Sequence, residues 1–366
     1  MKVKAMDEFS VQHLSGDPLK HAMADHLQDE WGQFVGRLDK AHPMQLAQWF
    51  AVIGDSFDVT QHLFVVRSKN DPQSPSSPPM QAFMHLWETN TPLFGHYLST
   101  LDGGLVTSGQ RASEALYAAL DTHLANSAAK YAAVRGECGE ESLRSAPAAY
   151  TAQQLHLVIA LPDTHSEMLS RLSKKTRNQI RRGEKLEPRI QVLDQIPDAF
   201  FDIYARLMRD LGTPTTARSF FAAMNQHLGN HLKFVGIYVG ERVVAGGVLI
   251  VHGDTCFNLF AANEPQAKSN YANYVLYNHM LKWAIEQGFS AFDMGRSAAG
   301  GGHHAFKLKW RPEELRFDYG LRGKDASSVK LTSSARGGLV NRVWQKLPLV
   351  ITNRVGPLLR RSLPFG

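Results

Sequence analysis

Cysteine is scarce in this sequence, which has only Cys138 and Cys256 among its 366 residues. The two lie far apart and in neither a CxxC spacing nor any other spacing typical of a metal site. They therefore exclude a disulfide framework, and they favour a reducing compartment.

Long apolar runs are also missing. No window reaches the roughly 18 apolar residues of a membrane-spanning helix. Residues 1–20 have no apolar stretch after their lysines, unlike a secretory signal. We therefore expect a cytoplasmic protein.

The composition describes a globular chain, with 43% hydrophobic and 20% charged residues. Its length fits two domains of about 150 to 200 residues and a tail. The formal net charge of +6 is compatible with an anionic partner but does not identify one.

The order of the predicted elements indicates two similar α/β halves. In the first half we predict strands at 62–68, 80–87 and 130–136, a Pro/Ser-rich hairpin loop at 69–79 and a helix at 112–126. In the second half we predict strands at 155–161, 232–240, 242–253, 255–265 and 290–295, and helices at 166–186, 198–212 and 274–288. The polar and small residues at 137–150 suggest the boundary, so we place domains at 1–148 and 149–325 and a tail at 326–366.

The stretch DMGRSAAGGGHHAFKLKW, residues 293–310, is the strongest candidate for a site. Asp293 and Arg296 fall where a buried strand leaves its sheet, and side chains there commonly face a ligand. The glycines at 300–302 let backbone amides approach an anion, and Lys307 can supply a positive charge to a phosphate or an oxyanion. The alternative is an Asp–Arg ion pair that anchors a loop beside solvated lysines.

Two further basic features allow alternatives. Arg177 and Arg181 lie on one face of the helix predicted at 166–186, which suits a phosphate-rich partner such as tRNA or equally a solvated surface. The tail has Arg342, Lys346, Arg354, Arg360 and Arg361 but no acidic residue, and Val340, Val343, Trp344 and Leu347 recur at helical spacing. This segment can lie on an anionic membrane, or it can dock on the domains, with Pro348 and Pro357 breaking it into short pieces.

We predict no metal site, because His303 and His304 are adjacent and have no acidic or cysteine partner at ligand spacing. Tyr271, which precedes the helix at 274–288, is a candidate for substrate contact.

Together, the helix with LSKKTRNQIRRGEKL, the segment FAANEPQAKSNYANYVLYNHMLKWAIEQG, the block FDMGRSAAGGGHHAFKLKW and the tail WQKLPLVITNRVGPLLRRSLP resemble FemAB-like proteins of XrtA/PEP-CTERM exopolysaccharide systems. These proteins are a branch of the GNAT acyltransferase superfamily. The resemblance implies an α/β (α+β) fold of two tandem GNAT-like domains, each a mixed, largely antiparallel sheet flanked by helices. It also implies acyl or aminoacyl transfer to an amine of a cell-envelope or exopolysaccharide precursor, which could be lipid-linked.

The resemblance places Asp293, Arg296, Phe306, Lys307 and Trp310 on the DFGRS…FK…W pattern of this branch. We expect Lys307 and Arg296 to bind phosphate or stabilise the oxyanion, and Asp293 to position Arg296 or take up a proton through water. His304 stands where relatives usually have Tyr, and Ala298-Ala299 replaces a more polar pair. The residues that we place at the substrate-binding surface are Asn258, Tyr271, Asn273, Ser297, Gly301, Phe306, Trp310, Arg177 and Arg181.

The donor stays open, and we expect no tightly bound cofactor. Acetyl-CoA enzymes of the superfamily hold the pyrophosphate in a glycine-containing turn, whereas PQAKSNYANYV has no glycine. This disfavours acetyl-CoA relative to a carrier held elsewhere, and the donor stays either aminoacyl-tRNA or acyl-CoA. The alternatives are an ordinary acyl-CoA-dependent N-acyltransferase and a non-catalytic scaffold that binds polysaccharide or a lipid carrier, with the tail at the inner face of the membrane.

Overall fold

The structure is a computed structural model. It describes residues 8–38, 41–69, 79–91, 95–135, 148–268, 271–323 and 337–361. The chain forms two compact units. Unit 1 comprises residues 1–152, 316–331 and 361–366, and unit 2 comprises residues 153–315 and 332–360. The chain passes into unit 2 within strand β6 (Ala148–Ala160) and back into unit 1 within strand β12 (Glu313–Arg322).

Unit 1 has the strand order β1-β2-β3-β4-β5, with the end of β12 against β5. All neighbours are antiparallel except β4 and β5, which are parallel. The strands are β1 (Phe9–Ser15), β2 (Gln61–Ser68), β3 (Met80–Thr91), β4 (Gly95–Thr107) and β5 (Tyr131–Arg135). The predicted hairpin of β2 and β3 is confirmed, and its loop at 70–78 lies outside the described residues.

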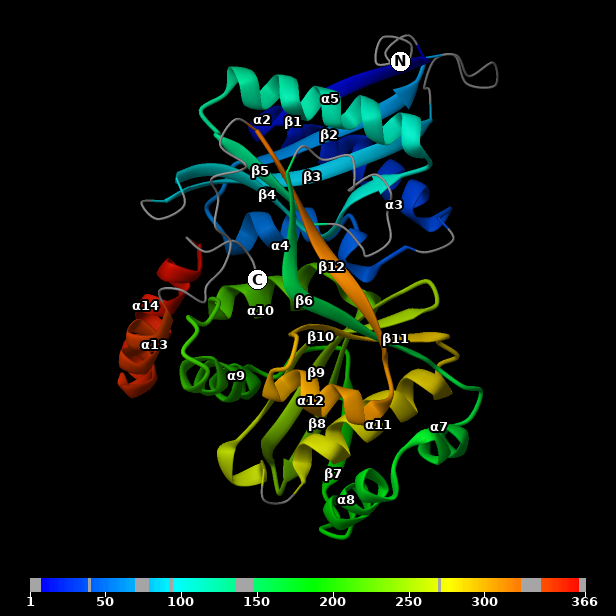
Figure 1. The fold of residues 1–366 in the computed structure, drawn as a ribbon, viewed down its shortest axis with the longest axis vertical. Helices are drawn as coiled ribbons and strands as arrows, with labels where there is room; N and C mark the ends of the chain where they lie inside the picture. The colour runs from blue at the N-terminus through cyan, green and yellow to red at the C-terminus, as the bar shows by residue number, and fades with distance from the viewer. Residues whose placement is uncertain are drawn as a thin grey trace. The chain divides into compact units, whose positions relative to one another are not determined.

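Helices cover both faces of the unit 1 strands. Residues 63–66 of β2 are therefore all apolar and buried, instead of alternating between apolar and polar. Phe64 and Val66 pack in the cluster under α5 (Gln110–Asn126), whereas Leu63 and Val65 pack in a second cluster. The second cluster lies under α2 (Gly16–Ala22), the π-helical segment η1 (Met23–Leu27) and α3 (Gln28–Gly36). The short segments η2 (Pro43–Gln45) and α4 (Trp49–Ser56) follow α3. Figure 1 shows α5 lying along the strands.

Unit 2 repeats this plan with the strand order β6-β11-β10-β9-β8-β7. Its strands besides β6 are β7 (Arg189–Leu193), β8 (Leu232–Val239), β9 (Arg242–His252), β10 (Thr255–Asn263) and β11 (Ala291–Ala298). Only β10 and β11 are parallel, and α11 (Ala272–Glu286) connects them as α5 connects β4 and β5. The predicted tandem α/β units with mixed, largely antiparallel strands are confirmed.

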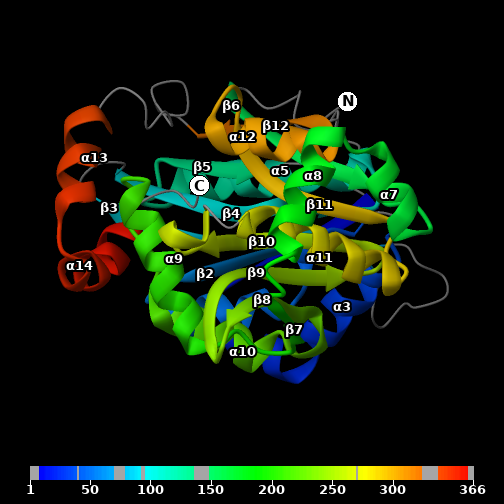
Figure 2. The ribbon, with the colours of Figure 1, turned by 90° about the horizontal axis from the view of Figure 1, so that it is seen from below.

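Helices also cover both faces of the unit 2 strands (Figure 2). Val235 and Ile237 of β8 join the core cluster with α7 (His165–Arg171), α8 (Lys174–Glu184) and α11. Phe234 points to the opposite face, where its ring lies 5.0 Å from that of Phe200 on α9 (Asp198–Asp210). Helix α10 (Arg218–His227) adds Phe221 to the same aromatic cluster.

The single helix predicted at 166–186 is wrong, because the structure has two helices there. Leu172 is extended, and the Ser173 hydroxyl accepts a hydrogen bond from the amide of Thr176 at 3.1 Å, which starts α8. Strand β7 and helix α10, which lie with α9 between α8 and β8, were not predicted from the sequence.

The basic tail forms two helices, α13 (Gly337–Lys346) and α14 (Leu349–Arg361). The Gln345 side-chain amide donates to the carbonyl of Asp210 at 3.0 Å, so α13 lies beside α9 (Figure 1). Pro348 separates the helices as predicted, but Pro357 lies inside α14 and does not end it. Among the described residues, no helix has the length and apolar character needed to cross a membrane.

Candidate active site

The candidate site begins where β10 and β11 separate. The two strands pair in parallel only over 255–257 and 291–293. Beyond this point β10 has an irregularity between Asn258 and Phe260, and β11 has one between Asp293 and Arg296. Residues 294 and 295, between the paired residues Asp293 and Arg296, thus leave the regular ladder, and their backbone polar groups become available for other contacts.

Gly295 lies at the centre of this irregular segment, with φ = 70°. A Cβ atom at this position would lie 3.3 Å from the carbonyl oxygen of Asn258. Glycine alone avoids both the left-handed strain and this close approach. The carbonyl of Gly295 is thereby free to face Lys307.

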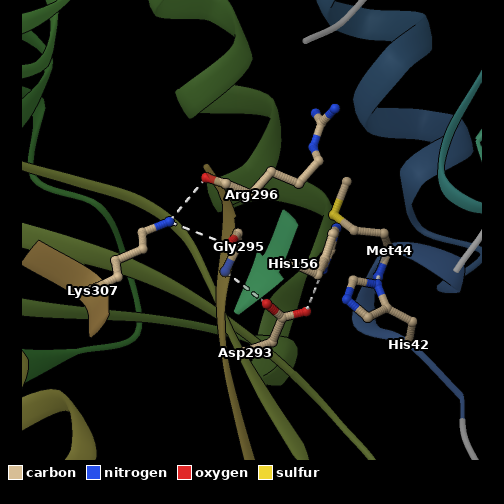
Figure 3. A network of polar contacts seen from close by, with 7 residues as sticks. All are labelled: His42, Met44, His156, Asp293, Gly295, Arg296 and Lys307. Atoms are coloured by element: carbon tan, nitrogen blue, oxygen red, sulfur yellow. Dashed lines mark hydrogen bonds and ion pairs between the residues drawn. The ribbon is translucent and has the colours of Figure 1, made fainter. Parts of the chain in front are cut away.

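Asp293 is buried, and two polar groups surround its carboxylate (Figure 3). Oδ1 accepts a hydrogen bond from the amide of Gly295 at 2.6 Å, and Oδ2 lies 3.1 Å from Nδ1 of His156 on β6. His156 was not predicted as a site residue, because its only signal is a histidine inside the apolar strand LHLVIAL. Its partner lies 137 positions away along the chain, so no local pattern could have paired them.

Lys307 comes from the short helix α12 (Gly302–Lys307), and its side chain is buried. Nζ donates to the carbonyl oxygens of Arg296 at 3.0 Å and Gly295 at 3.3 Å (Figure 3). Burial lowers the pKa of Lys307 from 10.5 to about 8, the Asp293 charge raises it, and Arg296 lowers it. The ammonium is therefore charged at neutral pH yet close to losing its proton.

Arg296 has a second cation near it, from the tail. Burial lowers the pKa of Arg360 on α14, the nearby Tyr204 raises it, and Arg296 lowers it. Arg296 therefore interacts electrostatically with both Lys307 and Arg360 in unit 2. Arg360 was predicted only as part of the basic tail and not as a neighbour of the site.

Comparisons with known proteins agree with this architecture. Residues 170–308 match the family model of the acetyltransferase (GNAT) domain. Unit 2 therefore carries an acyltransferase domain of the GNAT type. The match includes Asp293, Arg296 and Lys307. A search of curated proteins gave no match.

Several solved structures share the fold at low sequence identity. The crystal structure of FemX has a TM-score of 0.58 and 14% identity, with 80% of this chain and 95% of FemX covered. The C-terminal domain of a putative lysylphosphatidylglycerol synthetase from Agrobacterium fabrum has a TM-score of 0.56 and 13% identity, with 82% and 92% covered. A tandem GNAT protein from the clavulanic acid pathway has a TM-score of 0.50 and 9% identity, with 86% and 98% covered. The predicted tandem GNAT-like fold is thus confirmed.

Asn258 stabilises the irregular part of β10 in this GNAT domain. Its side-chain amide donates to the carbonyls of Phe260 at 2.9 Å and Val248 at 3.2 Å, and its oxygen accepts from the Tyr277 hydroxyl at 3.2 Å. Cys256, two residues earlier, is buried, and burial together with Asp293 raises the pKa of its thiol. The thiol is therefore protonated and is not a nucleophile at neutral pH.

Aromatic residues attach α12 to the core. Trp310 is fully buried, and its ring lies 5.8 Å from that of Tyr277. The Phe306 ring lies 5.2 Å from those of Tyr274 and Tyr277. Phe306 and Trp310, which we had placed at the substrate surface, thus anchor the helix that carries Lys307.

The loop before α12 is more ordered than a run of glycines suggests. The amide of Gly300 donates to Nδ1 of His304 at 3.1 Å, and Nε2 of His304 lies 2.8 Å from the Glu314 carboxylate. Gly301 caps α12 and accepts from the amide of Ala305 at 2.9 Å. His304 therefore has Glu314 as the acidic neighbour that sequence spacing did not indicate. Ser297, at the end of β11 before this loop, is buried, and its hydroxyl has no hydrogen-bond partner among the described residues.

Arg177 and Arg181 do not form a common phosphate surface. The Arg177 guanidinium donates to the carbonyl of Leu172 at 2.6 Å, so it caps the end of α7. Arg181 is exposed and lies 3.3 Å from the Asn178 side-chain oxygen. Arg182, which we had not singled out, donates to the hydroxyl of Tyr271 at 3.2 Å.

A cavity of about 500 Å³ lies elsewhere in unit 2, between the end of α8, the β8–β9 hairpin and the start of α11. Its two arginines are paired: Arg189 lies 3.2 Å from Glu241, and Arg242 lies 3.4 Å from Glu264. The lining also holds Glu187, so its carboxylates outnumber its arginines and the cavity does not favour a diphosphate. Tyr271 adopts a left-handed conformation at the N-cap of α11, and Asn273, in its first turn, is half-buried.

Proposed function

We propose that unit 2 catalyses FemAB-type N-acyl transfer to an amine of a cell-envelope or exopolysaccharide precursor. The observation that carries the proposal is the buried ammonium of Lys307 at the point where β10 and β11 separate. A buried charge is costly to maintain, so its presence beside a carboxylate in an irregular strand is typical of a functional site.

The proposed step is attack of the acceptor amine on the carbonyl carbon of an ester or thioester donor. A C–N bond forms, the C–O or C–S bond of the donor breaks, and the released hydroxyl or thiol takes up a proton. The attacking amine gives its proton to water or to the leaving group. Lys307 and Arg296 stabilise the negative oxygen of the intermediate or a phosphate of the acceptor.

Asp293 acts in this scheme through its neighbours. Its contacts with the Gly295 amide and with His156 keep the 293–296 segment in the conformation that presents two carbonyls to Lys307. Its negative charge also raises the pKa of Lys307. Alignment of the reactants then supplies much of the rate acceleration, without a dedicated general base.

An aminoacyl ester such as aminoacyl-tRNA is our preferred donor. The segment before α11 has no glycine turn for a pyrophosphate, and the arginines of the nearby cavity are paired with glutamates. An acyl-CoA donor is the alternative. One solved structure of similar fold belongs to a putative lysylphosphatidylglycerol synthetase, whose name denotes a lysyl group on a lipid.

We further propose that α14 contacts an anionic membrane. This helix packs its small and polar residues, Thr352 and Gly356, inward and exposes Val350 (79%), Leu358 (60%), Ile351, Val355 and Leu359. A helix on a water-soluble surface has the opposite arrangement. Arg342, Lys346 and Arg354 are exposed on the two tail helices, and 337–361 contains no acidic residue.

The charge of this face favours lipid over a second copy of the chain. Two copies that met through α14 would bring like charges together, whereas anionic headgroups would neutralise them. The same helix carries Arg360, which interacts electrostatically with Arg296 of the candidate site. A lipid-linked acceptor fits this arrangement.

Mass spectrometry of surface polysaccharide and lipid-linked precursors tests the transfer. A deletion strain is complemented with wild type, with Lys307→Ala or with Lys309→Ala, a lysine that is exposed on the adjacent turn. We expect an acyl or aminoacyl group to be absent in the deletion strain and to return with wild type and Lys309→Ala only. Full restoration by Lys307→Ala at normal protein levels would favour the non-catalytic scaffold instead.

A further inference from the structure

Three histidines from separate elements of unit 1 converge outside the candidate active site. His13 is on β1, His62 on β2 and His123 on α5, and one potential ligand atom of each lies within 4.8 Å of the others. Nε2 of His13 and Nδ1 of His62 are 3.1 Å apart. The adjacent pair His303 and His304 drew attention in the sequence, whereas these three are spread over 110 positions between His13 and His123.

Sheet register explains the convergence. His13 pairs with Phe64 and Ser15 pairs with His62, so His13 and His62 are diagonal neighbours on one face. Phe64 of that face packs in the cluster under α5, and the His123 ring lies 4.6 Å from the His13 ring. The backbone of three elements therefore holds the group together.

His123 offers a buried ring nitrogen to a metal ion. Nε2 of His123 is buried and has no hydrogen-bond partner among the described residues. A neutral ring nitrogen offers its lone pair to a divalent ion.

Glu88 on β3 lies close to the group, on the side where metal-bound histidines commonly have an outer carboxylate. Its carboxylate lies 3.9 Å from Nε2 of His62, the nitrogen that does not face His13. A carboxylate there would orient the imidazole and make Nδ1 the ligand atom. Glu88 is itself fixed by His96, 2.6 Å away.

We propose that His13, His62 and His123 bind a divalent transition-metal ion of the zinc class. Zinc–imidazole bonds of about 2.0–2.1 Å in a tetrahedral site place ligand nitrogens about 3.3 Å apart, close to the 3.1 Å between His13 and His62. The third ligand nitrogen, from His123, lies within 4.8 Å of the other two, so the group must contract when it binds an ion. Because His13 is exposed, the fourth position faces solvent, and the ion ties β1 to α5.

Mg²⁺ and Ca²⁺ do not suit this group, because they prefer oxygen ligands and the three candidates offer only nitrogen. The site is independent of the proposed acyl transfer, because all three histidines belong to unit 1. Metal binding and transfer activity are therefore measured separately.

Calorimetric titration of the chelator-treated full-length protein with ZnCl2 tests the proposal, with thermal unfolding as a second readout. We expect one ion per chain and a higher Tm for wild type. His13→Ala and His123→Ala, at exposed and half-buried positions, are expected to weaken binding at least tenfold and to abolish the Tm increase. His26→Ala is the control, because His26 is exposed and beside Asp25 in the same unit. Co²⁺ is expected to give the absorption bands of a tetrahedral site.

Circular dichroism establishes that each variant is folded before titration. The proposal is overturned if folded wild type takes up no zinc, or if the His13→Ala and His123→Ala proteins bind zinc as tightly as wild type. A loss of binding in His26→Ala alone would also overturn it, by placing the ion at the exposed Asp25–His26 pair.

Discussion

Asp293 holds the amide of Gly295 at 2.6 Å, and the carbonyl of the same glycine accepts a hydrogen bond from Lys307 at 3.3 Å. One residue in a left-handed conformation therefore separates the carboxylate from the ammonium. The two charges influence each other without forming a direct ion pair. Lys307 consequently keeps a lowered pKa, and its ammonium stays available for a ligand.

Removal of the Lys307 ammonium is expected to reduce kcat/KM by about 10²- to 10³-fold, the usual effect of losing one oxyanion donor. Lys307→Ala tests this with the donor and acceptor identified by mass spectrometry. Lys309→Ala serves as the matched control, since its ammonium is exposed and donates to the Tyr274 hydroxyl at 2.7 Å. Equal rates for the two variants would contradict the assignment.

The pH dependence of transfer is expected to report the Lys307 pKa of about 8. Lysine carries its charge below its pKa, so the contribution of the ammonium is present below pH 8 and lost above it. Titration of the acceptor amine affects every variant equally. The ratio of kcat/KM for wild type to that for Lys307→Arg, whose guanidinium stays charged, should therefore fall above about pH 8. A ratio that does not change up to pH 10 would exclude Lys307 as an electrostatic catalyst.

Asp293→Asn is expected to move this pH limit downward. The carboxylate raises the pKa of Lys307, so its neutralisation leaves burial and Arg296 to lower that pKa further. The amide oxygen of Asn can still accept from Gly295, which preserves the backbone contact. The profile of kcat/KM against pH for Asp293→Asn should therefore be shifted to lower pH relative to wild type, in addition to any overall loss of rate. A loss of rate with no displacement would indicate a purely structural role.

The same lysine is expected to make stability depend on pH. Its pKa is 10.5 in the unfolded chain and about 8 when folded, so between these values the unfolded state binds one more proton. The free energy of unfolding of wild type relative to Lys307→Met should therefore rise by up to about 1.4 kcal/mol per pH unit between pH 8 and 10. Urea unfolding at several pH values measures this difference. A constant difference would mean that Lys307 has an ordinary pKa.

Gly295 and Gly253 offer a matched comparison of backbone strain. Both have positive φ, 70° and 55°, but a Cβ at Gly253 meets nothing within 4 Å. Gly253→Ala should cost about 1 kcal/mol for the left-handed conformation alone. Gly295→Ala should cost more, because the Asn258 carbonyl must move, and it should also reduce transfer. If the two variants lose the same stability and Gly295→Ala keeps its transfer activity, the backbone near Asn258 accommodates a Cβ at position 295 without disturbing the site.

Part of this site could be predicted from the sequence. Asp293 and Arg296 were placed at a strand end and Lys307 near them because strand, glycine loop and FK block follow one another closely. Their mutual geometry could not be predicted, because it depends on the irregularity of β10 at Asn258 and on His156 from a distant strand. Neither the irregularity of β10 nor the contact with His156 leaves a signal in the local sequence.

Burial was the property that sequence patterns described least well. Phe306, Trp310 and Arg177 have residue types typical of binding surfaces, yet the first two pack against α11 and the third caps α7. The tail shows the converse. Its helical spacing was recognised around Trp344, which is buried, but no periodicity indicates that α14 turns its apolar side outward. That orientation depends on small residues fitting closely, as Gly356 does against Thr215.

Vesicle flotation tests the membrane contact proposed for α14. We expect wild type to float with vesicles that contain phosphatidylglycerol and to remain unbound with phosphatidylcholine alone. Val350→Asp combined with Leu358→Asp should abolish flotation. Both side chains are exposed in the protein and would enter the membrane, where two carboxylates would oppose insertion. Val239→Asp is the control, since Val239 is equally exposed but lies on β8. If the double variant floats like wild type, α14 is not the contact. If wild type instead forms a dimer that the double variant loses, a second copy covers the helix despite its like charge.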